Sequence, residues 1–157
     1  MTQVARPAPE TLDAFTVPSQ PGNERLALAR VAGTVQGRGL SEARLERLKT
    51  AVAEATMNAI EHGNGNRPEI PVEVEVTLRG DDITVAISDQ GGELHPGDGD
   101  QEEPDLVKKL DGDQSPRGWG LFLIRNMVDA MDVTTDGQRH TIRLTMRTTG
   151  AAHDEHV

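Results

Sequence analysis

Two neighbouring stretches of the chain alternate apolar and polar residues with the period of two that is typical of β-strands. The first runs from 71 to 79 and the second from 82 to 89. Gly80 and Asp81 stand between them, and this residue pair favours a tight turn. The pattern therefore predicts a hairpin.

A second hairpin is predicted near the C-terminal end. Apolar residues alternate along 140–148, and the Asp136-Gly137 pair before them is a turn signal. We expect the partner strand of this hairpin to begin at Val133. Near the other end, 11–19 is rich in β-branched and aromatic residues and predicts one more strand.

Helical periodicity appears in three stretches, 21–39, 41–63 and 119–133. The clearest is 41–63, where Ser41 is a good N-cap residue. Its apolar residues recur on one narrow stripe, which we expect to face the core: Leu45, Leu48, Val52, Ala55 and Ala59. Three polar residues, Glu54, Asn58 and Glu61, lie about 120° from that stripe on a second face.

The order of elements is strand, helix, helix, hairpin, long loop, helix, hairpin, which predicts an α+β fold in a single domain over 10–148. The loop, 92–117, is rich in Gly, Pro and acidic residues, and a loop of this length is usually a lid or a binding loop. The ends, 1–9 and 149–157, lack hydrophobic periodicity and are expected to be flexible tails.

Charge and composition exclude several classes of function. The 157 residues carry a formal net charge of -10, which argues against direct binding to nucleic acid. The chain has no cysteine, so disulfides, thiolate nucleophiles and cysteine-type zinc sites are excluded. We find neither an apolar run long enough to span a membrane nor a secretion signal, so we expect a cytoplasmic protein.

Glu54 and Asn58 are four residues apart on the predicted helix 41–63, so their side chains lie on the same face. An amide oxygen can bind Mg²⁺ when phosphate and water fill the other positions, and a carboxylate one turn away can deprotonate a hydroxyl group. The alternative is an ordinary solvated polar face that ends at His62 and Gly63.

Asp89 continues the parity of Ile83, Val85 and Ile87, so it points into an apolar layer at the end of its strand. A carboxylate in that position is costly unless a partner pairs with it. It can accept a hydrogen bond from an exocyclic amine such as that of adenine, and the glycines that follow it would let a flat base approach the backbone. A plain strand end with a glycine turn is the alternative.

Gly118 and Gly120 stand directly before an apolar helical stretch. Free backbone amides at the start of a helix are a good site for phosphate oxygens. Close packing of a loop on a helix start explains the same two glycines equally well. The stretch is not a Walker A loop, because Gly-Lys-Ser/Thr does not follow it.

Taken in order, these three stretches resemble the N, G1 and G2 boxes of the GHKL ATPase superfamily, which includes gyrase, histidine kinases and mismatch-repair ATPases. Within it, "EATMNAIEHGN" and "GWGLFLIRNMVDAMDV" look most like the anti-sigma-factor serine/threonine kinases of bacterial stress-response and sporulation switches. The resemblance covers roughly 10–148. It implies a two-layer sandwich with helices on one face of a mixed, mainly antiparallel sheet.

The resemblance also implies a role for each matching residue. Asn58 would coordinate Mg²⁺ and Glu54 would be the catalytic base, while Asp89 would bind the adenine amine with Gly91 beside the base. The residues at the phosphates of ATP would be Gly118, Gly120 and Leu121. The loop 92–117 would be the ATP lid.

The function implied by the resemblance is an ATP-dependent serine/threonine protein kinase that acts as an anti-sigma factor. Its substrate would be a STAS-type anti-anti-sigma protein, and it would also sequester a sigma factor. Members of this superfamily often form dimers, so a homodimer is a further expectation. The alternative function is a nucleotide-binding switch that shapes a partner surface without phosphoryl transfer.

Overall fold

The computed structural model describes residues 8–90 and 116–148, with the backbone alone for 116–119. These residues form one five-stranded sheet with the strand order β1-β2-β3-β5-β4. All four neighbouring pairs of strands are antiparallel. The strands are β1 (Glu10–Pro18), β2 (Pro71–Arg79), β3 (Asp82–Asp89), β4 (Ala130–Asp136) and β5 (Arg139–Arg147).

The two predicted hairpins are present as β2-β3 and β4-β5. On the three central strands, the alternating apolar residues are buried on one face of the sheet, because successive side chains of a strand point to opposite sides. The buried residues are Val72, Val74 and Val76 on β2, Ile83, Val85 and Ile87 on β3, and Ile142, Leu144 and Met146 on β5.

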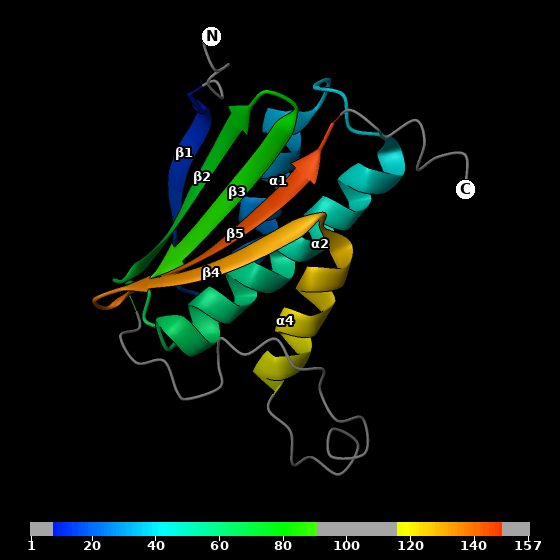
Figure 1. Cartoon of the computed structure of the whole chain (residues 1–157). Helices are drawn as coiled ribbons and strands as arrows, with labels where there is room; N and C mark the ends of the chain where they lie inside the picture. Colours follow the sequence, from blue (N-terminus) through cyan, green and yellow to red (C-terminus); the bar gives the residue numbers. More distant parts are fainter. Residues whose placement is uncertain (1–7, 91–115, 149–157) are drawn as a thin grey trace, which may run out of the picture.

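The helices α1 (Glu24–Val35), α2 (Glu42–Asn58) and α4 (Pro116–Met127) cover that apolar face (Figure 1). The predicted α+β sandwich of two layers is therefore confirmed. The sheet differs from the expectation in one respect, because its described strands pair only in the antiparallel sense and the sheet is not mixed. No helix in the described ranges has the length and apolar character needed to cross a membrane.

Helix α2 begins as predicted, with the Ser41 hydroxyl accepting a hydrogen bond from the backbone N–H of Arg44 at 3.2 Å. Its stripe packs into the core, with Leu48, Val52 and Ala55 fully buried. The helix does not simply run on to residue 63. Its last turn, η1 (Ala59–Gly63), is a π-helix, and such wider turns are frequent at functional sites.

Helix α4 and strand β4 do not have the predicted boundaries. The helix begins at Pro116 instead of 119, because proline fits the first position of a helix, where no backbone N–H is needed. Strand β4 begins at Ala130 instead of Val133. The reason is tertiary, since the backbone N–H of Asp129 donates to the carbonyl oxygen of Thr145 at 3.0 Å, which starts the pairing with β5.

Candidate functional site

Asn58 is the last residue of α2 and is only 8% exposed. Its amide nitrogen Nδ2 is buried and has no hydrogen-bond partner among the residues that the structure describes. Leaving a buried polar group unsatisfied costs about 1–3 kcal/mol. An amide held in this way is suited to a ligand that supplies the missing polar contact.

Glu54 lies one helical turn before Asn58 and is half-buried. Burial raises the pKa of the Glu54 carboxyl above its ordinary value, and the negative charges of Glu61 and Glu24 raise it further. A carboxylate whose affinity for a proton is increased is a better general base near neutral pH than an ordinary one. The polar face predicted for α2 therefore consists of a half-buried acid and a buried amide.

Asp89 ends β3 and is buried, at 4% exposure, as its parity with Ile87 predicted. The expected partner for this buried carboxylate is present. His140 lies directly opposite Asp89 in the register of β3 and β5, and its Nδ1 is 3.3 Å from Oδ2 of Asp89. His140 is itself buried. The sequence analysis missed this residue, because nothing within β5 marks one polar side chain as the neighbour of Asp89.

Gly63 brings the end of η1 against Asp89. A Cβ atom at position 63 would overlap the Asp89 carboxylate, so only glycine lets the helix end approach the strand end this closely. The sequence analysis had offered Gly63 as a helix-ending residue. The structure gives it a second role, which is to bring the backbone after Asn58 into contact with the acid of β3.

Asn64 fixes the same strand end and was also missed. This fully buried side chain accepts a hydrogen bond from the backbone N–H of Gln90 at 2.8 Å and donates to the Ser19 hydroxyl at 2.9 Å. It therefore joins the residue after β3 to the segment after β1. In the sequence, Asn64 stands among Gly and Asn residues that resemble ordinary loop positions.

Helix α4 completes the described part of the site. A Cβ atom at Gly120 would lie 2.8 Å from Nδ2 of Asn58, so the two helices touch at this point. Leu121 is 7% exposed and packs in the hydrophobic core. Gly118 and Gly120 both lie within the helix and not before it, because α4 starts at Pro116. Of these two glycines, Gly118 is close enough to the helix start to have a backbone amide outside the helical hydrogen-bond pattern.

The structure thus places Gly120 against Asn58, with Glu54 one turn earlier on α2, and places Gly63 against Asp89. Gly91 and most of the predicted lid, 92–117, lie outside the described residues. No group of three or more His, Cys, Asp or Glu side chains in the described ranges could hold a metal ion. A cation bound at Asn58 would therefore take most of its ligands from a bound phosphate and from water.

Comparisons with known proteins identify the family of this chain. Residues 17–146 match the model of a family described as a histidine kinase-like ATPase domain. An anti-sigma F factor of Oceanobacillus iheyensis is 31% identical over 119 residues, which cover 76% of this chain and 80% of that relative. The serine-protein kinase RsbW of the same species is 30% identical over 129 residues, which cover 74% of this chain and 75% of the kinase.

A solved structure shows the same fold. The RsbU and RsbW domains of a Mycobacterium tuberculosis protein superpose on this chain with a TM-score of 0.61 and 18% identity. The match covers 89% of this chain but 32% of that one, so the chain spans about a third of the solved protein.

Proposed function

Because the chain belongs to the histidine kinase-like ATPase domain family, we propose that it is an ATP-dependent serine/threonine protein kinase that acts as an anti-sigma factor. It phosphorylates an anti-anti-sigma protein and binds a sigma factor. The names of relatives that match about three quarters of the chain support this function. The structural observation that supports it is the contact of Gly120 with the buried Asn58, together with the contact of Gly63 with the buried Asp89.

In the proposed complex, the adenine amine donates a hydrogen bond to the Asp89 carboxylate. Gly63 and His140 both contact this carboxylate, so its position is set before the nucleotide arrives. Preorganised acceptors of this kind favour binding because little order is lost when the ligand enters. Gly91 is assigned to the edge of the base, as the family resemblance implies.

Gly118, Gly120 and Leu121 are assigned to the phosphate end of the nucleotide. Gly118 offers a backbone amide in the first turn of α4, where the helix dipole favours negative charge. Gly120 acts differently, because its missing side chain leaves room for the Asn58 amide. Leu121 anchors this turn in the core.

Asn58 is assigned as a ligand of Mg²⁺. Its buried amide nitrogen lacks a hydrogen-bond partner within the described residues, and a bound nucleotide with its metal ion would supply one. Its oxygen would be the ligand, and the nitrogen would be free to donate to a phosphate oxygen. The ion, when bound, supplies positive charge that stabilises the charge developing on the phosphate oxygens.

Glu54 is assigned as the catalytic base. Its carboxylate takes the proton of the substrate hydroxyl while that oxygen bonds to the γ-phosphorus. The bond from this phosphorus to the bridging oxygen breaks, and ADP leaves with the electron pair. The raised pKa of Glu54 makes it a stronger proton acceptor than an exposed glutamate.

The test uses the purified full chain and proteins captured with it from its native cell. Binding of a fluorescent ATP analogue and transfer of labelled phosphate are measured for the wild type, Glu54→Gln and Glu46→Gln. Glu46 is exposed on the same helix and serves as the matched control. We expect Glu54→Gln to keep nucleotide binding and lose at least about 100-fold in transfer, with Glu46→Gln unchanged.

Three results would decide against parts of this proposal. A wild-type rate for Glu54→Gln would remove the role of this residue as a base. A wild type that binds the nucleotide but labels no captured protein would favour the switch without phosphoryl transfer. An acid-labile product would indicate transfer to histidine in place of serine or threonine.

A further inference from the structure

Asn64 directly follows the π-helical turn η1 and is fully buried. Its backbone N–H donates to the carbonyl oxygen of Ala59 at 2.8 Å, which closes η1. Its side chain contacts three other segments of the chain: the residue after β1, the start of β2 and the residue after β3. A buried amide with this many partners holds the segments around it in one arrangement.

The amide nitrogen of Asn64 is surrounded by oxygen atoms. Nδ2 donates to the Ser19 hydroxyl at 2.9 Å, and to the carbonyl oxygens of Ile70 and Pro71 at 3.2 and 3.3 Å. Ser19 is itself fully buried and donates to the same carbonyl oxygen of Ile70. Because a carbonyl oxygen can only accept, the nitrogen must lie on this side and the amide has one orientation. Oδ1 of Asn64 is therefore turned towards the end of β3.

This oxygen fixes the peptide bond that follows Asp89. The register of β3 with β5 ends at Asp89 and His140. The next backbone N–H, that of Gln90, donates to Oδ1 of Asn64 at 2.8 Å. A peptide unit is planar, and this N–H belongs to the unit that begins at the Cα atom of Asp89. The hydrogen bond therefore sets the direction in which the Asp89 side chain leaves the backbone.

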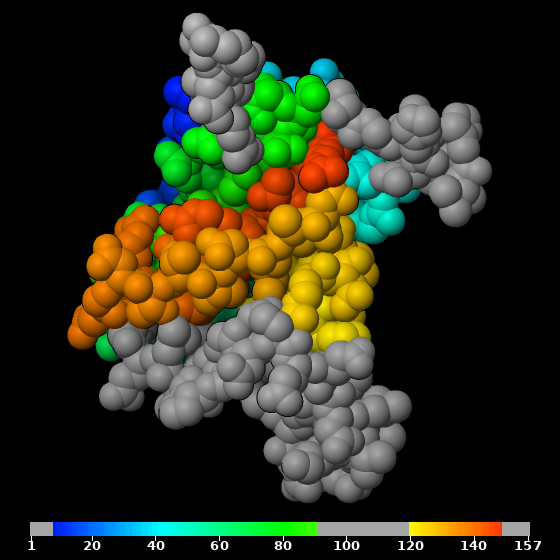
Figure 2. All heavy atoms as spheres, viewed as in Figure 1, coloured from blue at the N-terminus to red at the C-terminus, as the bar shows by residue number. Residues whose placement is uncertain are grey.

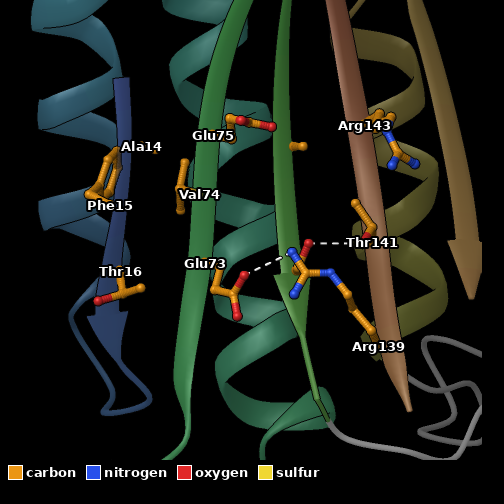
Figure 3. Close-up of a pocket in the computed structure, with 11 residues that line it drawn as sticks. Ala14, Phe15, Thr16, Glu73, Val74, Glu75, Arg139, Thr141 and Arg143 are labelled. Atoms are coloured by element: carbon orange, nitrogen blue, oxygen red, sulfur yellow. Dashed lines mark hydrogen bonds and ion pairs between the residues drawn. The ribbon is translucent and has the colours of Figure 1, made fainter. Parts of the chain in front are cut away.

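Gln90 has a second contact, on the face of the sheet that lies away from the helices. Its side-chain Nε2 donates to Glu73 at 3.3 Å, and Glu73 also pairs with Arg139 at 2.8 Å (Figure 3). Figure 2 shows strand atoms at the molecular surface on this side. Polar contacts that are open to water contribute little, so the bond to the buried Asn64 is the stronger restraint on Gln90.

We propose that Asn64 is a positioning residue for the base of the nucleotide. It acts through Gln90 on the Asp89 carboxylate, and it thereby sets the preference for a purine that carries an amine over one that carries an oxygen at the same place. This inference rests on the proposed function, which assigns Asp89 to the adenine amine. Gly63 contacts the same carboxylate, so two consecutive residues at the end of η1 place it.

The experiment measures how well three ligands displace a fluorescent ATP analogue from the full chain. They are ATP, inosine triphosphate, which has an oxygen where adenine has its amine, and inorganic tripolyphosphate, which has no base. We expect the wild type to prefer ATP over inosine triphosphate, because the oxygen of inosine would face the Asp89 carboxylate without a proton between them.

Asn64→Ala should reduce the affinity for ATP about tenfold, which is the effect of losing one well-placed hydrogen bond. The affinity for tripolyphosphate should be unchanged, because that ligand makes no contact with Asp89. The ratio of the affinities for ATP and inosine triphosphate should therefore fall by about the same factor. A general loss of structure would weaken all three ligands together and would leave this ratio unchanged.

Ser88→Ala is the matched control. Ser88 directly precedes Asp89 and is 4% exposed, and its hydroxyl hydrogen-bonds to that of Thr141 at 2.8 Å on the other face of the sheet (Figure 3). This variant also loses a buried hydrogen bond beside Asp89, but it keeps the contact of Asn64 with Gln90. Its preference for ATP should be that of the wild type. Circular dichroism checks that both variants are folded.

Hydrogen exchange of the Gln90 backbone amide, followed by NMR in the wild type without nucleotide, tests the contact itself and needs no variant. Residue 90 lies beyond the paired part of β3, so an amide without a partner there would exchange at nearly the rate of an unfolded chain. We expect the Gln90 amide to exchange at least about 100-fold more slowly.

Four results would overturn this inference alone, provided that the wild type binds ATP. These are an unprotected Gln90 amide, a folded Asn64→Ala variant that keeps the wild-type preference, an equal loss of tripolyphosphate affinity in that variant, and the same loss of preference in Ser88→Ala. A wild type that binds no ATP, or that binds inosine triphosphate equally well, would overturn the assignment of Asp89 in the proposed function and this inference with it.

Discussion

Gly120 of α4 lies directly against the Asn58 side chain, so that a Cβ atom at position 120 would be 2.8 Å from Nδ2. This contact fixes the distance between the start of one helix and the end of another. Asn58, the candidate magnesium ligand on α2, can therefore keep its position only because residue 120 on α4 has no side chain. Substitution at Gly120 is therefore a direct test of the site.

We expect Gly120→Ala to lower kcat/KM for phosphoryl transfer by about 100-fold, because a displacement of about 1 Å in a reacting geometry can cost this much. The Asn58 amide is the group that must move. Steady-state kinetics at several magnesium concentrations measures the effect. An unchanged magnesium dependence would contradict the assignment of Asn58.

Gly33→Ala is the matched control for this substitution. Gly33 lies within α1, and a Cβ atom there would meet nothing within 4 Å. Alanine favours a helix over glycine by about 1 kcal/mol, so the free energy of unfolding should rise by up to that amount. Activity should stay at the wild-type value.

The pH dependence of the reaction should report the environment of Glu54. The pKa of this carboxyl is raised by burial first, then by Glu61 and Glu24, and a base is active only when ionised. The rate should therefore fall on acidification at a higher pH than an ordinary carboxyl would give. Glu61→Gln removes one negative charge, so it should move this acid limb to lower pH. A pH profile of kcat that is the same in both proteins would contradict the proposed coupling.

The same shift predicts an effect on stability. Because the pKa of Glu54 is raised in the folded protein, the folded state holds this proton more tightly than the unfolded chain does. Stability is therefore lost as the pH rises from the ordinary carboxyl pKa through the raised one. Glu54→Gln should unfold at a higher denaturant concentration than the wild type at pH 7, and at the same concentration below the ordinary pKa.

His140 should act on nucleotide affinity through Asp89. Its Nδ1 is 3.3 Å from the Asp89 carboxylate, in a buried environment. His140→Phe removes this partner, and we expect KM for ATP to rise about tenfold with a smaller change in kcat. His140→Asn can place an amide N–H near the same position and should recover part of the affinity. If kcat falls by the same factor by which KM rises, in both variants, the effect is general disruption of the site and not a role in positioning Asp89.

Arg44 should contribute to stability and not to the reaction. It is 5% exposed, forms an ion pair with Asp129 and donates from Nε to the carbonyl oxygen of Arg147 at 3.3 Å. Arg44→Met leaves Asp129 without this partner, and we expect a loss of about 2 kcal/mol in the free energy of unfolding, because Asp129 is partly hydrated. Chemical denaturation measures this.

The exposed ion pair of Arg30 with Asp13 serves as the control for the buried Arg44. Its atoms are 2.8 Å apart, but Arg30 is 55% exposed, so Arg30→Met should have a much smaller effect. ATP affinity should be unchanged in both variants. A loss of affinity in Arg44→Met would mean that this end of the fold is coupled to the nucleotide site.

The local pattern was sufficient to predict most of the secondary structure. Period-two alternation identified β2, β3 and β5, and the Ser41 cap and apolar stripe identified α2, because these signals depend on neighbours within one element. The parity of Asp89 with Ile87 likewise predicted a buried carboxylate. Glu54 and Asn58 were predicted to share one face of a helix because they are four residues apart, and both lie on α2.

The tertiary structure alone decided which elements meet. The pairing of Asp89 with His140 depends on the register between β3 and β5, which are about 50 residues apart in the chain. The contact of Gly120 with Asn58 depends on how two helices pack, and the start of β4 at Ala130 depends on its pairing with β5. Local periodicity fixes how each side chain points within its own element. Partners distant in sequence are chosen by the packing of the whole core, which no single stretch of residues contains.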